Sequence, residues 1–280
     1  MKWRIAIVAV ALVAAAGCGH GSKRDPVADA RAGLDHVQRG TVHVQLEMAA
    51  AGTQSSARSG FATDGTFDLA PSGATRPATD VTTVNLGAPD DQPAHFVSTG
   101  RDAYLVQGGV GFQLTSVPVA PAQRPLDLSA LLADAAGQTP STTAQGESVD
   151  RVAGRVDPVA AMNGVVDLAD RLGAGPDAAL RVSPADAPRV RGATTSSTVE
   201  VLTGQDDHVL RSLTAHIELA VPMAPSPASA QGATGGALVH ALYALGHVEV
   251  TVEVRLGDPN APVVISPPAT IRPISELGGG

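Results

Sequence analysis

The clearest pattern in the chain is an alternation of apolar and polar residues in two stretches. In residues 247–256 every second position is Val or Leu, and in residues 41–48 Val and Leu alternate with polar side chains up to Met48. A period of two places successive side chains on opposite faces of a strand. Both stretches are therefore predicted to be strands with one buried face and one solvated face.

Further stretches look extended because they are rich in β-branched and aromatic residues and are separated by Gly, Pro and Asp clusters. They are residues 59–69, 81–86, 94–99, 104–106 and 149–156. Gly108 and Gly109 supply the positive φ angles of a tight turn, which predicts a hairpin over residues 104–114. A second hairpin is predicted around the turn 204–207, which is rich in Asp.

Helical spacing follows two Asp-Pro pairs, Asp25-Pro26 and Asp157-Pro158. Each pair offers an N-cap and a first-turn proline. Apolar residues then recur three and four positions apart, in residues 27–37 and in residues 158–172. A further helix is predicted for residues 126–135, and a polar loop for residues 136–147.

The order of these elements indicates the fold class. Strands with one apolar face belong to antiparallel sheets with a single covered face. The sequence therefore predicts one α+β domain over residues 27–277, in which helices cover the apolar face of a long curved antiparallel sheet. Residues 222–236, rich in Pro, Ala, Ser and Gly, are predicted to be a flexible insertion. Residues 237–245 fit a helix and a strand equally well.

The N-terminus has the features of a secretion signal that ends at the only cysteine, Cys18. Lys2 and Arg4 precede the uncharged residues 5–16, and small residues follow. This apolar segment is shorter than the roughly 20 residues that a membrane-spanning helix needs. An anchor, if there is one, has to come from another source.

Cys18 closes the stretch A-A-G-C, which resembles the bacterial lipobox, where the cysteine thiol receives diacylglycerol and becomes the first mature residue. We therefore predict a signal peptide over residues 1–17 and a lipidated tether over residues 18–26. Two acyl chains suffice for lasting attachment to the outer face of the plasma membrane. An ordinary signal peptide with a chance cysteine is the alternative.

The charge of the mature chain argues against two kinds of partner. Without Lys2 and Arg4, the 19 basic residues fall to 17 against 27 acidic ones, a formal net charge of −10. An acidic chain has neither the basic footprint of a nucleic-acid-binding protein nor a polybasic patch for anionic headgroups. With one cysteine, no internal disulfide can form.

The sequence lacks the motifs of the common hydrolases and metalloenzymes. Neither G-x-S-x-G nor H-E-x-x-H occurs, and the only mature lysine, Lys23, has no serine three residues before it. The eight histidines are scattered, and the pairs Asp90-Asp91 and Asp206-Asp207 are better explained as turn residues. We therefore expect no enzyme activity, no cofactor and no metal site.

Apolar side chains dominate what the chain offers a ligand, and they allow two interpretations. Trp3 leaves with the signal peptide, so that Tyr104 and Tyr243 alone remain for stacking on sugars. Abundant Val, Ala and Leu suit alkyl groups. Periodicity does not distinguish a hollow interior that binds them from an ordinary packed core.

Several motifs, taken in their order along the chain, resemble LppX/LprG-type lipoproteins of actinobacteria, relatives of the lipoprotein-carrier fold. The resemblance covers residues 27–268. Besides the lipobox, the motifs are Y-L-V…G-F-Q-L at residues 104–114, V-A-G-R-V-D-P at 152–158, V-T-V-E-V-R-L at 250–256 and P-V-V-I-S-P-P at 262–268.

The resemblance implies a half-barrel sheet that wraps part-way round helices, with an apolar cavity for the acyl chains of lipids or glycolipids. The helix at residues 158–172 would act as a lid. Two features depart from the family: Phe112 stands where relatives often carry Trp, and residues 222–245 look inserted. The residues expected to line the cavity are Val44, Leu46, Met48, Phe61, Phe96, Phe112, Met162, Val166 and Ile217.

The function predicted from the sequence is thus a tethered lipoprotein that carries or presents a lipid or glycolipid in the cell envelope. Its expected partners are that lipid, the plasma membrane through Cys18 and an envelope transporter, and not a nucleic acid. The alternative is an envelope interaction or structural lipoprotein with a solid core. A hydrolase ranks third, because no nucleophile or metal site is recognisable.

Overall fold

The computed structural model describes residues 37–51, 58–69, 74, 76–87, 93–114, 134–142 (backbone only), 146–173, 180–220 and 246–277. Its helices are α3 (Pro158–Arg171), α4 (Ala187–Ala193) and the short 3-10 helix η2 (Ile274–Glu276). Its strands are β1 (Arg39–Ala50), β2 (Arg58–Asp68), β3 (Ala78–Leu86), β4 (Ala94–Thr99), β5 (Ala103–Gln107), β6 (Val110–Gln113), β7 (Asp134–Thr142), β8 (Ser148–Arg155), β9 (Thr194–Gly204), β10 (Leu210–Ala220), β11 (His247–Gly257) and β12 (Thr270–Pro273).

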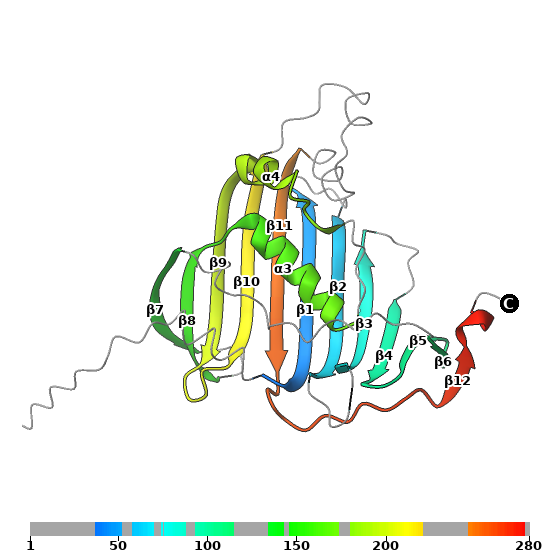
Figure 1. Cartoon of the computed structure of the whole chain (residues 1–280). Helices are drawn as coiled ribbons and strands as arrows, with labels where there is room; N and C mark the ends of the chain where they lie inside the picture. The colour runs from blue at the N-terminus through cyan, green and yellow to red at the C-terminus, as the bar shows by residue number, and fades with distance from the viewer. Residues whose placement is uncertain are drawn as a thin grey trace, which may run out of the picture.

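All twelve strands belong to one sheet (Figure 1), in the order β12-β6-β5-β4-β3-β2-β1-β11-β10-β9-β8-β7. Neighbouring strands are antiparallel, except that β12 runs parallel to β6. The end strands β7 and β12 do not pair with each other, so the sheet stays open. None of the helices in the described part of the chain has the length and apolar character needed to cross a membrane.

The strand register brings apolar residues from distant parts of the chain into continuous rows. One row crosses seven neighbouring strands, from β3 to β8, and every member is buried. Its members are Thr83, Thr63, Val44, Val254, Leu213, Val201 and Val152. We call the face that carries this row the inner face and the opposite face the outer face.

Helix α3 packs on the inner face against β1 and β11, and in Figure 1 it crosses the sheet obliquely. Its start is fixed by Asp157, whose carboxylate accepts a hydrogen bond from the Ala160 N–H (2.9 Å), and by Pro158 in the first turn. A buried stripe that includes Met162 and Val166 faces the sheet. The helix ends before Gly173, which takes a φ of 80°.

The structure confirms the predicted fold class, an α+β fold with a long, mostly antiparallel sheet covered on one face. β11 buries Val248 to Val254 at alternate positions, as its pattern predicts. The helix predicted at residues 158–172 is α3, and the two predicted hairpins are β5–β6 and β9–β10. The long, strongly periodic elements were thus the predictable ones.

The predictions of a helix up to residue 135 and a loop from residue 136 are wrong over residues 134–142, which form strand β7, whereas residues 146 and 147 lie in a loop as predicted. β7 pairs with β8 along its length, with an irregularity between Ala136 and Gln138. Its sequence, D-A-A-G-Q-T-P-S-T, carries no apolar alternation, so nothing local indicates a strand. Pro140 is tolerated because β7 lies at the edge of the sheet. Residues 126–133 lie outside the described part of the chain.

Other predictions also fall on residues that the structure does not describe. These are the signal peptide and tether with Cys18, the helix at 27–37 apart from Val37, the insertion at 222–236 and the ambiguous stretch 237–245. Conversely, α4 and β12 were not predicted. α4 has only seven residues. β12 has only four, and all four are exposed.

Candidate functional site

Seven of the nine side chains predicted to line a cavity meet in one cluster between α3 and the inner face. Each is at most 1% exposed, and they come from β1, β2, β10 and α3. They are Val44, Leu46, Met48, Phe61, Met162, Val166 and Ile217. The register explains the convergence, because Leu46 lies opposite Phe61 on β2 and Val252 on β11. That these side chains line a cavity stays a prediction.

The other two predicted residues lie towards the β12 end of the sheet. Phe96 on β4 is partly buried against the cluster. The end of α3 reaches it, because a Cβ built on Gly173 would lie 2.1 Å from Phe96 Cε1. Phe112 on β6 is 9% exposed and lies opposite Leu105, outside the cluster. Phe96 therefore borders the cluster and Phe112 lies outside it, and the prediction that they line a cavity stays a prediction.

The inner face also carries residues that were not nominated from the sequence, mostly valines of β8, β9 and β11. The alternation in β11 contained the signal for its own members. For β8 and β9 the signal was weaker, because the place of β9 beside β10 and of β8 beside β9 follows only from the sheet order. These residues are Val152, Val199, Val201, Leu213, Val250, Val252 and Val254.

Two hydroxyl side chains interrupt this apolar surface on neighbouring strands. Thr63 on β2 is fully buried, and Thr83 on β3 is 7% exposed. Their Oγ1 atoms are 3.0 Å apart and form a hydrogen bond with each other. Because each hydroxyl satisfies the other, the pair can stay in an apolar setting without a further ligand.

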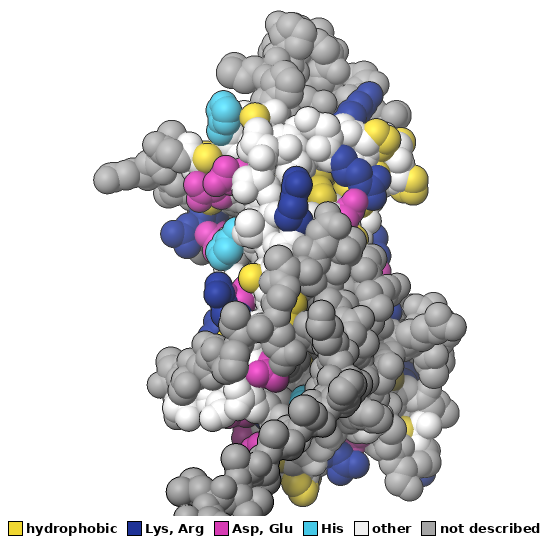
Figure 2. Space-filling model, turned by 90° about the vertical axis from the view of Figure 1, so that its left-hand side faces the viewer, with side chains coloured by type: hydrophobic (Ala, Val, Ile, Leu, Met, Phe, Trp, Pro, Cys, Tyr) yellow, Lys and Arg dark blue, Asp and Glu magenta, His cyan; other side chains and the backbone are white. Residues whose placement is uncertain are grey.

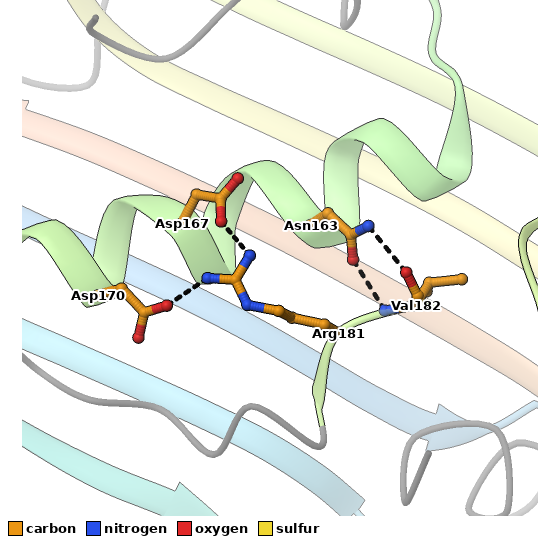
Figure 3. Close-up of polar contacts among 5 residues, drawn as sticks. All are labelled: Asn163, Asp167, Asp170, Arg181 and Val182. Atoms are coloured by element: carbon orange, nitrogen blue, oxygen red, sulfur yellow. Dashed lines mark hydrogen bonds and ion pairs between the residues drawn. The ribbon is translucent and has the colours of Figure 1, made fainter. Parts of the chain in front are cut away.

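The outward side of α3 is held by the segment that precedes α4 (Figure 3). The Asn163 amide donates to the Val182 carbonyl (3.0 Å) and accepts from the Val182 N–H (2.8 Å). The Arg181 guanidinium forms ion pairs with both Asp167 and Asp170, one turn further along the helix. We call these five residues the α3 clamp. One helix thus presents an apolar stripe to the sheet and a polar stripe to the clamp.

A second set of polar contacts joins the start of α3 to α4. Arg191 Nε donates to Asp157 Oδ2 at 2.6 Å. Burial alone would raise the pKa of the Asp157 carboxyl, but the hydrogen bonds from Arg191 and from the Ala160 N–H hold that pKa below its usual value. For Arg181, burial would lower the pKa, and the ion pairs with Asp167 and Asp170 raise it instead.

The outer face is polar and carries pairs of ionisable side chains. His43 Nδ1 lies 2.7 Å from Asp64 Oδ1, and His95 Nε2 lies 2.7 Å from Asp80 Oδ1. Figure 2 views the molecule from the β7 side and shows acidic, basic and histidine side chains along its left margin. Among the described residues, no group of three or more His, Cys, Asp or Glu side chains is placed to hold a metal ion. The two faces of the sheet therefore offer different chemistry, apolar contact inside and charge outside.

Comparisons with known proteins find no matching family model and no matching curated protein. Among solved structures, the chain resembles LprF from Mycobacterium bovis. The identity to LprF is 14%, the match covers 87% of this chain and 95% of that chain, and the TM-score is 0.47. It also resembles the LolA superfamily protein NE2245 from Nitrosomonas europaea, with 10% identity, 85% and 93% coverage and a TM-score of 0.23. The ligand and the role of this protein therefore have to be argued from its own residues.

Proposed function

We propose that this protein is a membrane-tethered lipoprotein that binds the acyl chains of a lipid or glycolipid between α3 and the inner face. It carries or presents that lipid in the cell envelope and performs no covalent chemistry. The proposal rests on the apolar character of the inner face, on its extent and on the short helix that packs against it.

The observation that carries the proposal is the size of the apolar face relative to α3. The seven neighbouring strands that carry the buried row, at about 4.8 Å spacing, span about 29 Å. With 14 residues, α3 is about 21 Å long and about 10 Å across. The rows under and beside it are built mainly of valine, whose short side chain fills little depth. A flexible acyl chain is the kind of ligand that would suit a long and mainly apolar face of this kind.

The mechanism that follows is differential solvation. Each methylene group transferred from water gains about 0.8 kcal/mol, so a long acyl chain leaves a bilayer only for a site that shields most of it. In this proposal α3 is the lid, and Met162 supplies an adaptable surface for tails of different shape. The α3 clamp would set how readily the lid moves.

The setting of this activity follows from the sequence prediction at Cys18. A diacylglyceryl anchor on the thiol would hold the protein at the outer face of the plasma membrane. From there it would exchange lipid with the membrane and with an envelope transporter. The net charge of −10 expected for the mature chain speaks against a nucleic-acid partner.

The alternative is an envelope interaction or structural lipoprotein with a solid core. The near-complete burial of the seven clustered side chains, none more than 1% exposed, favours that interpretation. The polar outer face, with its His-Asp and Arg-Glu pairs, would then be the surface that meets a partner protein.

The two proposals are separated by native mass spectrometry of the mature chain carrying Cys18→Ser, expressed in a host that contains envelope lipids. Organic extraction would identify any bound molecule. The decisive variant is Val252→Phe, which adds a ring on the inner face of β11. Its matched control is Thr251→Phe, the neighbouring position, which faces outward.

For a carrier we expect discrete lipid adducts on the parent protein and on Thr251→Phe, and none on Val252→Phe. Val252→Phe should stay as stable as the parent, because its ring occupies the space of the ligand. A solid core predicts a different result. No variant would then carry lipid, and Val252→Phe would lose about 1–3 kcal/mol of unfolding free energy through overpacking.

A further inference from the structure

Buried polar atoms without hydrogen-bond partners gather at the start of β3. In the described part of the chain four such side-chain atoms occur, and three of them, Arg76 Nε, Arg76 Nη1 and Thr79 Oγ1, lie within four consecutive residues. The fourth, His43 Nε2, lies at an outer-face position of β1. Buried polar atoms in native proteins nearly always have partners, so this concentration calls for an explanation.

Thr79 lies on the inner face. It is 1% exposed and is opposite Phe67 on β2 and Ser98 on β4. The neighbouring Ser98 hydroxyl is satisfied, because it donates to the Pro77 carbonyl at 2.8 Å. The Thr79 hydroxyl has no such bond and remains free to bind a ligand atom.

Arg76 lies just before β3, beside the turn that joins β4 to β5. Its backbone N–H donates to the Gly100 carbonyl at 3.3 Å, which fixes the position of the residue. Arg151, Arg181 and Arg211 each form an ion pair with a carboxylate. The Arg76 side chain forms no such ion pair with any described residue. Two of the three guanidinium nitrogen atoms are thus buried without partners, which lowers the stability of the fold because these N–H groups lose hydration without compensation.

We infer that Arg76 and Thr79 form a recognition site for an oxyanion, the carboxylate or phosphate at the polar end of the bound amphiphile. This inference rests on the proposed function and makes it more specific. Arginine N–H groups and a hydroxyl are donors suited to such oxygens, and hydrogen bonds to charged groups are the strong ones. Two steps along β3, Val81 faces Phe96, so apolar side chains lie beside these donors for the start of an acyl chain.

The test measures binding of palmitate, of hexadecanol and of inorganic phosphate alone to the mature Cys18→Ser chain by titration calorimetry. Palmitate and hexadecanol share the alkyl chain and differ in the charged end. We expect palmitate to bind about tenfold more tightly. Arg76→Gln should abolish that preference and leave hexadecanol binding within about twofold of the parent. The control is Arg101→Gln, an exposed arginine of the adjacent turn, which should keep the preference.

The possible results have distinct meanings. An equal affinity of the parent protein for palmitate and hexadecanol, with both bound, would overturn the oxyanion site and leave the lipid carrier standing. No binding of palmitate, hexadecanol or inorganic phosphate would overturn both proposals. Binding of inorganic phosphate alone that depends on Arg76 would support the oxyanion site and identify a free anion, instead of a lipid headgroup, as its ligand.

A second variant guards against a purely structural role of Arg76. Arg76→Met keeps the length of the side chain and removes the unpartnered charge, so we expect an unfolding temperature equal to or above that of the parent, together with loss of the palmitate preference. A clear drop in unfolding temperature would instead show that the guanidinium supports the fold, and it would count against a ligand site.

Discussion

Gly173 shows how a single residue sets where α3 ends and what it touches. Its φ of 80° lies in the left-handed region that glycine adopts freely and other residues adopt at a cost. Its Cα also lies against the Phe96 ring, with no room for a Cβ. The end of the helix can approach the sheet this closely only because the side chain is absent.

At the residue scale we therefore predict that Gly173→Val lowers the unfolding free energy by about 2–4 kcal/mol, through backbone strain and overlap with Phe96. Gly192→Ala is the matched control, because Gly192 lies in α4 with open space at its Cβ position. That change should be neutral or stabilise the protein by up to about 1 kcal/mol. Chemical denaturation measures both, and an equal effect of the two substitutions would contradict the geometry.

The α3 clamp shows how one element is attached at the scale of whole helices and strands. Its two parts differ in burial. Val182 is 3% exposed, so its backbone N–H and carbonyl depend on the Asn163 side chain. The Arg181 side chain is 35% exposed, so water can replace its ion pairs.

We predict that Asn163→Ala lowers the unfolding free energy by about 1–3 kcal/mol, because it leaves two buried backbone groups unsatisfied. Arg181→Gln should lower it by at most about 1 kcal/mol. Hydrogen exchange should speed up in α3 in the first variant more than in the second. A larger effect of Arg181→Gln on either measurement would show that the ion pairs, and not the Asn163 bonds, hold the helix.

A helix or strand could be predicted from the sequence when its own residues carried the hydrophobic pattern that forms it. β11 and α3 each contain a full amphipathic pattern in their own residues, so their sequence indicates both type and buried face. β7 contains no such pattern and is a strand because β8 offers it a free edge. The four-residue β12 depends in the same way on β6, more than 150 residues earlier in the chain.

In the function proposed above, the whole molecule joins a lipid tether at Cys18 to a domain that binds acyl chains. At this scale we predict that the wild-type protein partitions into the detergent phase and that Cys18→Ser moves it to the aqueous phase, because the short apolar segment at residues 5–16 does not anchor the protein by itself. Phase separation followed by immunoblotting measures this. A Cys18→Ser protein that still follows the membrane fraction would exclude the cysteine as the anchor.

The sequence by itself determined the local elements and the chemistry available to them: amphipathic strands and a capped helix, an acidic mature chain and a side-chain inventory suited to alkyl groups. The tertiary structure decided which residues meet. Val44 and Val152 are more than 100 residues apart, yet they lie in one row because three strands, β11, β10 and β9, pair in register between them. It likewise decided that Phe96 borders the cluster and Phe112 does not, and that two nitrogen atoms of the Arg76 side chain are buried without hydrogen-bond partners. The alternation of residues shows which face of a strand is buried. The neighbours of a strand, the burial of each side chain and the polar atoms left without partners depend on contacts between segments far apart in sequence.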